Sequence, residues 1–448
     1  MNGSAKQDYD IVIVGAGVAG LAAMREAERK GLRPCLVEAR DRIGGRIYTM
    51  RDPRCAHPIE LGAEFIHGCP SELLDIVSEA RLLAYVVGGQ RWRSLGGHLT
   101  RIQDPWKQLH RVMRYDDAKK PDRSFAEFLS DKPGGRSAAE ARRLAYAFVE
   151  GFHAADATRI SARWVALGGS PSEEPEERGA MRIADGYDLI PDWLARGFRE
   201  RVMTNSVVER IDWEPQRVHL SVRRNKSRSI TTITGRAAVV TVPLGVLLAG
   251  SEEPGAIVFS PPLELIERTR ARLAMGCVTR VTILFRERWW TQRLRSAPRG
   301  ASLESLTFLH GDAGDLPVWW SLHPMLATAL VGWAGGPAAL QLSQRDDVEE
   351  RAIASVAANF GVTRRRVAAQ LVQVFTHDWQ HDPFSRGAYS YGLVGGADWA
   401  KRLARPIDRT LWLAGEAASR EGNTGTVHGA IASGHQAAQS IARTLGAR

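Results

Sequence analysis

The sequence has few cysteines and no uninterrupted hydrophobic run long enough for a membrane span. Four cysteines among 448 residues are too few for the disulfide framework of a small secreted domain. The first nine residues are polar and lack the apolar core of a secretory signal. The uncharged run at residues 325–342 contains Gly335, Gly336 and Pro337, so it predicts strand, turn and helix. We therefore expect a cytoplasmic protein with no membrane partner.

Positive charge exceeds negative charge, but no basic tract gathers it. The chain has 60 Lys and Arg against 50 Asp and Glu, a formal net charge of +10. The arginines are dispersed and no nucleic-acid-binding motif accompanies them, so we expect no nucleic-acid partner. No hydrolase-like nucleophile motif is present either. The length is sufficient for two or more domains.

The first strong pattern is a glycine-rich turn after a short apolar strand. Residues 11–14 are β-branched and apolar, which is typical of a buried parallel strand. The G-x-G-x-x-G motif follows directly, with glycines at Gly15, Gly17 and Gly20. Such glycines permit a tight turn, close approach to a pyrophosphate, and packing of a helix on the strand. The order predicts a dinucleotide-binding fold.

The residues that follow restrict which dinucleotide could bind. A helix is expected to about Lys30, and a second strand over residues 35–38 ends at Glu38. A carboxylate there accepts hydrogen bonds from an adenosine ribose and repels a 2′-phosphate, which argues against NADP.

A second glycine turn comes next. Ala39 and Arg40 lead into R-x-x-x-G-G-R, which ends with Gly44, Gly45 and Arg46. Guanidinium groups and exposed backbone N–H groups suit a diphosphate. A surface turn with solvated arginines is the alternative.

Three further segments carry a resemblance to a known family. They are IELGAEFIHG (59–68), HDWQHDPFSRGAYSYG (377–392) and LWLAGEAASREGNTGTVHGAIASGHQAA (411–438). Together with the glycine turns they resemble the flavin amine oxidase superfamily, which includes monoamine oxidases and the lysine-specific histone demethylase catalytic core. The polyamine oxidase branch is the most similar in its motifs.

The resemblance implies an α/β protein with two domains. A discontinuous Rossmann-like FAD-binding domain would comprise residues 1–75, 181–262 and 397–448. An α+β substrate-binding domain would comprise residues 76–180 and 263–396.

The resemblance also implies the residues that bind the cofactor. Beyond the two glycine turns, the expected FAD contacts are Gly62, Ala63, Glu64, Val208, Trp379, Gly415, Glu416, Gly425, Thr426 and Val427. Of these, Val208 corresponds to a strand that packs on adenine. Gly425 to Val427 start a helix whose N-terminal amides would point at the flavin.

Three residues are expected to be catalytic: His67, Arg280 and Tyr389. Arg280 stands where the family usually has a lysine that holds a water against flavin N5. His67 would act on protons near neutral pH or bind the amine, although a structural role is about as plausible. The expected substrate contacts are Glu64, His67, Trp320, Tyr389 and Thr426, with Glu64 available for a distal ammonium group.

Two departures from the monoamine oxidases matter. Ala388 replaces the cysteine that tethers their flavin, so FAD should be noncovalent. Thr426 replaces their second pocket tyrosine, which favours the polyamine-type branch.

The resemblance implies FAD-dependent oxidation of a polyamine-like or other primary or secondary amine. A hydride would pass to flavin N5, water would hydrolyse the imine, and O2 would regenerate FAD and give H2O2. The alternative is a desaturase or dehydrogenase acting on a C–C or other C–N bond. A zinc site at Cys55, His57, His67 and Cys69 is a weaker alternative, because the spacing fits no familiar zinc pattern. The sequence does not determine the oligomeric state.

The remaining expectations concern secondary structure. Residues 71–181 are expected to be mainly helical, with a mobile Pro-, Ser- and Glu-rich loop over residues 168–179. Ser343 and Asp346 are expected to form a capping box that opens a helix ending at Gly361.

Overall fold

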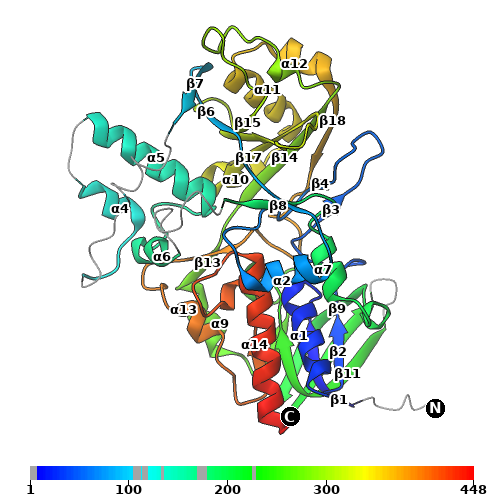
Figure 1. Ribbon diagram of the computed structural model, residues 1–448. Coiled ribbons are helices and arrows are strands. Elements are labelled where there is room, and N and C mark those ends of the chain that lie inside the picture. Colours follow the sequence, from blue (N-terminus) through cyan, green and yellow to red (C-terminus); the bar gives the residue numbers. More distant parts are fainter. Residues whose placement is uncertain are drawn as a thin grey trace.

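The computed structural model describes residues 8–103, 113, 120–132, 136–168, 179–224 and 229–447. The chain forms two lobes, each built around a seven-stranded sheet (Figure 1). The lower lobe contains the N-terminal strand and the C-terminal helix, and the upper lobe contains the second sheet. Mixed α/β structure confirms the fold class predicted from the sequence.

The lower sheet has a parallel centre and an antiparallel extension. Its order is β12-β9-β10-β11-β1-β2, and β20 also pairs with β11. Strands β2, β1, β11 and β20 are parallel, whereas β9, β10 and the first part of β11 form antiparallel pairs. The strands are β1 (Asp8–Val14), β2 (Pro34–Val37), β9 (Ser206–Glu214), β10 (Arg217–Arg224), β11 (Ile230–Val240), β12 (Val258–Ser260) and β20 (Leu411–Leu413).

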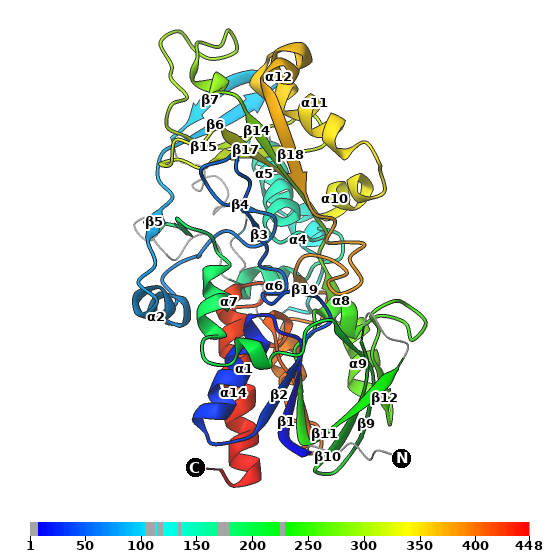
Figure 2. The same ribbon diagram turned by 90° about the vertical axis from the view of Figure 1, so that its right-hand side faces the viewer.

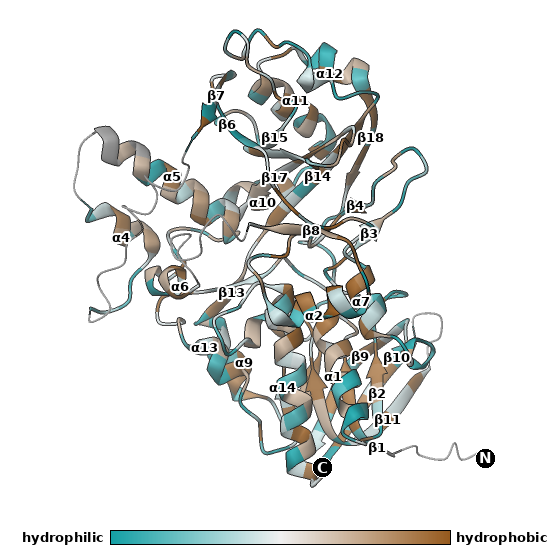
Figure 3. Ribbon diagram, in the orientation of Figure 1, coloured by the Kyte–Doolittle hydropathy of each residue, from teal (hydrophilic) through white to brown (hydrophobic). Residues whose placement is uncertain are grey.

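Two helices cover one face of the parallel strands. Helices α1 (Val18–Arg29) and α14 (Val427–Leu445) lie side by side there, and β10, β9 and β12 extend the sheet beyond β11, away from these helices (Figure 2). Ile11 and Ile13 belong to the core beneath these helices, whereas Val12 and Val14 belong to the core on the opposite face. Strands β1 and β2 are accordingly mostly hydrophobic, while α14 carries both hydrophobic and hydrophilic turns (Figure 3). The β1–α1–β2 unit predicted from the sequence is confirmed.

The upper sheet is almost entirely antiparallel. Its order is β18-β14-β17-β16-β15-β6-β7, with β15 and β6 as the parallel pair. The strands not yet given are β14 (Val278–Phe285), β15 (Leu306–His310), β16 (Val318–Ser321), β17 (Ala329–Gly335) and β18 (Leu371–Thr376). Helices α10 (Gly336–Ser343), α11 (Val348–Phe360) and α12 (Arg364–Gln370) belong to the same lobe. The core of this lobe is rich in tryptophan, including Trp289, Trp290 and Trp319.

The prediction of helices over residues 71–181 is only partly right. Strands β5 (Ala84–Val86), β6 (Gln90–Leu95) and β7 (His98–Ile102) lie in that range. β6 and β7 form a hairpin whose turn is Gly96-Gly97, both with positive φ. The helices of this range are α2 (Ser71–Glu79), α4 (Phe125–Ser130), α5 (Arg136–Phe152) and α6 (Ala162–Leu167). Most of the loop predicted at 168–179 lies outside the described residues.

The remaining helices and strands of the described chain are short. They are β3 (Thr49–Met50), β4 (Ile59–Glu60), β8 (Met181–Ile183), α7 (Leu189–Leu194), α8 (Leu244–Leu247), α9 (Glu264–Arg270), β13 (Leu273–Met275), β19 (Ser390–Gly392) and α13 (Trp399–Leu403), with 3-10 turns at Arg199–Arg201, Trp289–Thr291 and Glu416–Ala418. The strands β4 and β19 (Figure 2) and the strand β8 (Figure 1) lie near the boundary between the lobes.

The uncharged run at residues 325–342 folds as predicted, with β17 followed at once by α10. No helix within the described part of the chain is long and apolar enough to cross a membrane. The predicted capping box is wrong: α11 follows Asp347, and Ser343 instead ends α10, where its hydroxyl donates to Leu340 O. Gly361 ends α11 in the left-handed conformation, as predicted.

Gly434 permits the close approach of α14 to α1. A Cβ at this position would lie 2.0 Å from the carbonyl oxygen of Ala19, which is backbone and cannot turn away. The two helices therefore need glycine at their crossing.

We expect Gly434→Ala to destabilise the protein by about 1–3 kcal/mol, because overpacking forces the helices apart. The matched control is Gly151→Ala in the last turn of α5, where an added Cβ meets no atom within 4 Å. Alanine favours helix by up to about 1 kcal/mol there, so the control should melt at an equal or higher temperature. Thermal unfolding followed by circular dichroism measures both. Equal melting temperatures for the two variants would contradict the account of the crossing.

Candidate active site

The two glycine turns touch each other at the carboxyl end of β1. Gly15 has φ +100° and its N–H donates to Val37 O at 2.7 Å. A Cβ on Gly20 would lie 1.8 Å from Gly15 O, so this glycine is required for the helix to pack on the turn. Gly44 N–H donates to Ala16 O at 2.8 Å, and a Cβ on Gly45 would lie 3.3 Å from Gly17 Cα. The backbones of the two turns are thus in contact.

Glu38 lies at the end of β2, as the sequence predicts. Its buried carboxylate accepts from the N–H groups of Ala16, at 2.7 Å, and Arg40, at 2.8 Å. Burial raises the pKa of Glu38, and these backbone donors oppose the rise. Each carboxylate oxygen has a further lone pair, so ribose hydroxyl groups can still donate to it. Ala39 follows Glu38 on the same turn. Strand β9 begins next to Glu38, because the Ser206 N–H donates to Glu38 O. Val208 is buried in this strand.

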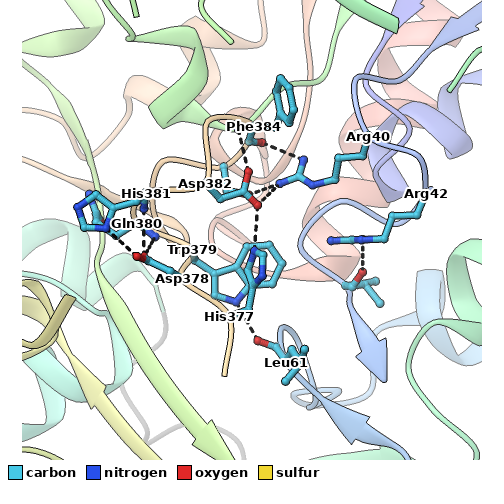
Figure 4. A network of polar contacts seen from close by, with 12 residues as sticks. Arg40, Arg42, Leu61, His377, Asp378, Trp379, Gln380, His381, Asp382 and Phe384 are labelled. Atoms are coloured by element: carbon cyan, nitrogen blue, oxygen red, sulfur yellow. Dashed lines mark hydrogen bonds and ion pairs between the residues drawn. The ribbon is translucent and has the colours of Figure 1, made fainter. Parts of the chain in front are cut away.

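Arg40 is engaged with the segment at residues 377–385 (Figure 4). Its Nη2 donates to Asp382 Oδ2 at 2.7 Å and to Ser385 Oγ at 2.9 Å. The other partner of Asp382 Oδ2 is His377 Nε2, at 2.9 Å, and His377 contacts the ring of Trp379 with centroids 4.2 Å apart. Arg40, predicted to meet phosphate, therefore links the nucleotide turn to Trp379.

Trp379 lies against Gly62. Its indole N–H donates to Leu61 O at 2.8 Å, and a Cβ on Gly62 would lie 3.2 Å from Trp379 Cζ2 and 2.0 Å from Arg46 O. Gly62 thus lets the ring and the second glycine turn approach the 61–64 segment, which includes Ala63. The predicted flavin contacts of this segment are brought together.

Glu416 joins three segments of the site. Its carboxylate accepts from Arg46 Nη1 at 2.9 Å, from Ser390 Oγ at 2.6 Å and from Gly425 N–H at 3.0 Å. Arg46 Nη1 also donates to Ala388 O at 2.7 Å. Glu416 was predicted to meet the cofactor, and in the structure its carboxylate accepts hydrogen bonds from these three protein donors. Gly415, with φ +124°, precedes it and leaves backbone free of a Cβ at this edge.

The N-terminus of α14 lies beside Tyr389. Thr426 caps the helix by accepting from Gly429 N–H at 3.0 Å, and Val427 is its first residue. A Cβ on Gly425, which has φ +73°, would be 3.4 Å from the Tyr389 ring. Tyr389 Oη donates to Phe152 O at 2.7 Å. Burial, with a smaller contribution from Glu416, raises the pKa of Tyr389, so the phenol stays protonated.

Aromatic rings continue from Tyr389 to His67. Phe152 is 49% exposed, stacks on Phe148 at 5.1 Å and meets the His67 ring at 5.6 Å. Phe65 lies between His67, at 5.9 Å, and Trp320, at 5.8 Å. His67 is exposed, yet surrounding protein lowers its pKa to about 4, helped by His428. We call the space bordered by the rings of Phe65, His67, Phe152 and Tyr389 the aromatic recess.

Glu64, at the end of this segment, is bound by two buried arginines. Arg280 Nη2 donates to Glu64 Oε2 at 2.6 Å, and Arg182 Nε donates to Glu64 Oε1. The indole N–H of Trp320 also donates to Oε2, at 3.2 Å. Burial would raise the pKa of Glu64, but the two guanidinium groups outweigh it and lower the pKa. A distal ammonium group of a substrate would be repelled here by both arginines, which opposes that predicted role of Glu64.

Arg280 keeps one donor without a partner. Its Nη1 donates to Gly62 O at 3.2 Å, while its Nε is buried and has no hydrogen-bond partner among the described residues. A buried donor left unsatisfied costs about 1–3 kcal/mol. The bare donor beside Gly62 therefore fits a site that a bound group completes.

The described residues fit FAD. A Cβ on Gly17 would meet no atom within 4 Å, so the first turn has open space beside its backbone. The contacts described above link the segments that carry this space, the Glu38 carboxylate, Gly62 and the Arg280 Nε. Ala388 offers no nucleophile, consistent with a noncovalent cofactor.

Comparison with known proteins decides the family. The family model for flavin containing amine oxidoreductases matches residues 18–442, which is most of the chain. The chain belongs to the flavin-containing amine oxidoreductases. Its cofactor is therefore FAD.

Similar proteins include several amine oxidases. Polyamine oxidase 2 of Arabidopsis thaliana is 28% identical to this amine oxidoreductase, over 96% of this chain and 87% of that protein. Lysine-specific histone demethylase 2 of Homo sapiens is 26% identical over 97% of this chain and 54% of that protein. Cyclohexylamine oxidase from Brevibacterium oxydans IH-35A shares the fold, with a TM-score of 0.79 at 21% identity, over 98% of this chain and 100% of that one. Wild-type putrescine oxidase bound to putrescine gives a TM-score of 0.78 at 19% identity, over 99% and 100%.

Several residues of the site carried no sequence signal of their own. Arg182 and Phe152 reach it from segments that were not singled out, and Ser390 lies within the 377–392 segment without having been assigned a role. The alternative zinc site gains no support, because no three potential ligands among His, Cys, Asp and Glu are grouped within the described ranges.

His67 should act as a neutral group. Because its pKa is lowered to about 4, His67 is uncharged between about pH 6 and 9. Its ionisation therefore does not make the reaction rate depend on pH in that range. We expect His67→Gln to leave the pH profile of anaerobic flavin reduction unchanged. Its rate constant should fall at most about tenfold, the worth of one neutral hydrogen bond. Loss of an acid limb in the variant would contradict this assignment.

Proposed function

We propose that this amine oxidoreductase oxidises a small primary or secondary amine with an apolar body. The observation that supports the proposal is the aromatic recess of Phe65, His67, Phe152 and Tyr389, which adjoins the Gly62 segment. Its walls desolvate a ligand and thereby disfavour a charged ammonium relative to a neutral amine.

The residues of the recess bind and orient the amine. His67 is neutral and offers one donor or one acceptor to the amine nitrogen. The Tyr389 hydroxyl donates its hydrogen bond to Phe152 O, so Tyr389 offers its ring face to the amine. Neither group is a strong base, so the amine must enter with its lone pair free.

FAD supplies the hydride acceptor, and the proposed overall reaction converts an amine, water and O2 into a carbonyl compound, a smaller amine or ammonia, and H2O2. Polyamine oxidase, putrescine oxidase and cyclohexylamine oxidase among the similar proteins support an amine as substrate. The position of Glu64 between two arginines favours a monoamine over a diamine.

The substrate class is tested by anaerobic bleaching of the bound flavin. Arylalkylamines, cycloalkylamines, alkylamines, putrescine and spermidine would be added separately under nitrogen. We expect bleaching by at least one monoamine with an apolar body, and slower bleaching by the diamine and polyamine. If every amine leaves the flavin oxidised, amine oxidation is refuted; if putrescine or spermidine is fastest, the monoamine preference is refuted.

Arg280 should limit the reaction with oxygen. A guanidinium is planar and permanently protonated, so it cannot reproduce the water geometry of an ammonium group. We expect Arg280→Lys to raise the rate of aerobic reoxidation about tenfold, which needs only ~1.4 kcal/mol. Stopped-flow measurement separates this rate from anaerobic reduction by the amine. Unchanged reoxidation in a variant with normal FAD content would place Arg280 away from the oxygen-reacting side.

A further inference from the structure

Three charged side chains form one buried unit at the boundary between the lobes. Glu64, Arg182 and Arg280 are 5%, 2% and 4% exposed. They come from the Gly62 segment, from β8 and from β14. One carboxylate is thus paired with two guanidinium groups, which leaves an excess positive charge inside the protein.

Among the described residues, Glu64 is the carboxylate that Arg182 contacts, and the hydroxyl of Tyr85 also interacts with its guanidinium. Its Nη2 donates to Ser321 O at 3.3 Å and its Nη1 to His323 O at 3.4 Å, and both acceptors are backbone carbonyls. Its guanidinium also lies 4.7 Å from the Phe65 ring centroid. Glu60 also interacts with Arg280, but burial raises the pKa of Glu60 to about 7, so this carboxyl offsets the excess positive charge only in part near neutral pH.

Arg280 places part of that positive charge next to the Gly62 segment. Its Nη1 holds Gly62 O, and its Nε is the buried donor without a partner. Without Arg182, Glu64 and Arg280 would be a neutral pair. With Arg182, the carboxylate is shared and Arg280 keeps part of its positive charge for a group bound beside Gly62.

We propose that Arg182 is a positioning residue that keeps the Glu64–Arg280 pair net positive, so that the unit stabilises negative charge on the bound flavin. The proposal rests on the proposed function only through the presence of FAD and does not require an amine substrate. Charge close to the reactive nitrogens of a flavin tunes its electronics, and burial strengthens such an interaction.

Sulfite binding measures this charge without turnover. Sulfite adds its lone pair to N5 of the oxidised flavin and gives an anionic adduct with altered absorbance. A nearby positive charge tightens the binding. The holoenzyme and each variant would be titrated with sulfite after their FAD content has been measured.

The net charge of the three side chains predicts a different sulfite affinity for each variant. Arg182→Met makes the unit neutral, and we expect sulfite to bind at least tenfold more weakly. That factor corresponds to about 30 mV in the two-electron potential of the flavin. Arg182→Met combined with Glu64→Gln restores a net positive unit, and sulfite affinity should recover towards that of the parent. Glu64→Gln alone should bind sulfite more tightly than the parent.

The control is Arg51→Met, which removes an arginine from the exposed pair with Asp188 and should leave sulfite affinity unchanged. An Arg182→Met affinity within twofold of the parent overturns the proposal. So does a double variant as weak as the single variant, because a purely structural role of Arg182 would not be rescued by removing Glu64. If Arg182→Met does not retain FAD, Glu64→Gln decides, and equal or weaker sulfite binding in it refutes the proposal. Failure of all amines to bleach the flavin would refute the proposed function and leave these outcomes standing.

Discussion

The site depends on buried carboxylates that each bind donors from distant parts of the chain. Glu416 binds Arg46, Ser390 and Gly425, and Glu64 binds Arg182, Arg280 and Trp320. Removing one partner of a buried ion pair leaves an uncompensated charge, which typically costs about 3–5 kcal/mol. Such contacts therefore fix the positions of their segments more strictly than apolar packing does.

The nucleotide-binding unit could be predicted because its signal is local. The β-branched strand, the glycine turn, the helix and the acid at Glu38 occupy one short stretch, and each has its own physical reason. The close contacts of Gly15 with Gly20 show why that spacing admits so few alternatives. The strand and helix of the uncharged run at 325–342 could be predicted for the same reason, since Gly335 and Gly336 lie between them.

Other parts of the fold and the site could not be predicted from the sequence, because contacts with distant residues determine them. β6 and β7 lie in an arginine-rich stretch without an apolar run, and pairing with β15 stabilises them. The Gly96-Gly97 turn between alternating residues was an available hairpin signal that the helical composition around it obscured. Arg182 meets Glu64 across 118 residues of sequence, and no spacing rule connects them. Glu64 itself was singled out, but its role changes once the two arginines beside it are known.

The charge of the site also explains how it accommodates an amine without a strong base. A free alkylamine resembles lysine, whose pKa near 10.4 lies about three units above neutral pH, so most of it is protonated in solution. His67, with a pKa of about 4, is too weak a base to remove that proton efficiently. The positive charge shared by Arg182 and Arg280 lies near the recess and disfavours a second cation, as do the aromatic walls. Under the proposed function, the same buried charge that stabilises electrons on the cofactor therefore also lowers the pKa of the bound amine and selects its reactive neutral form.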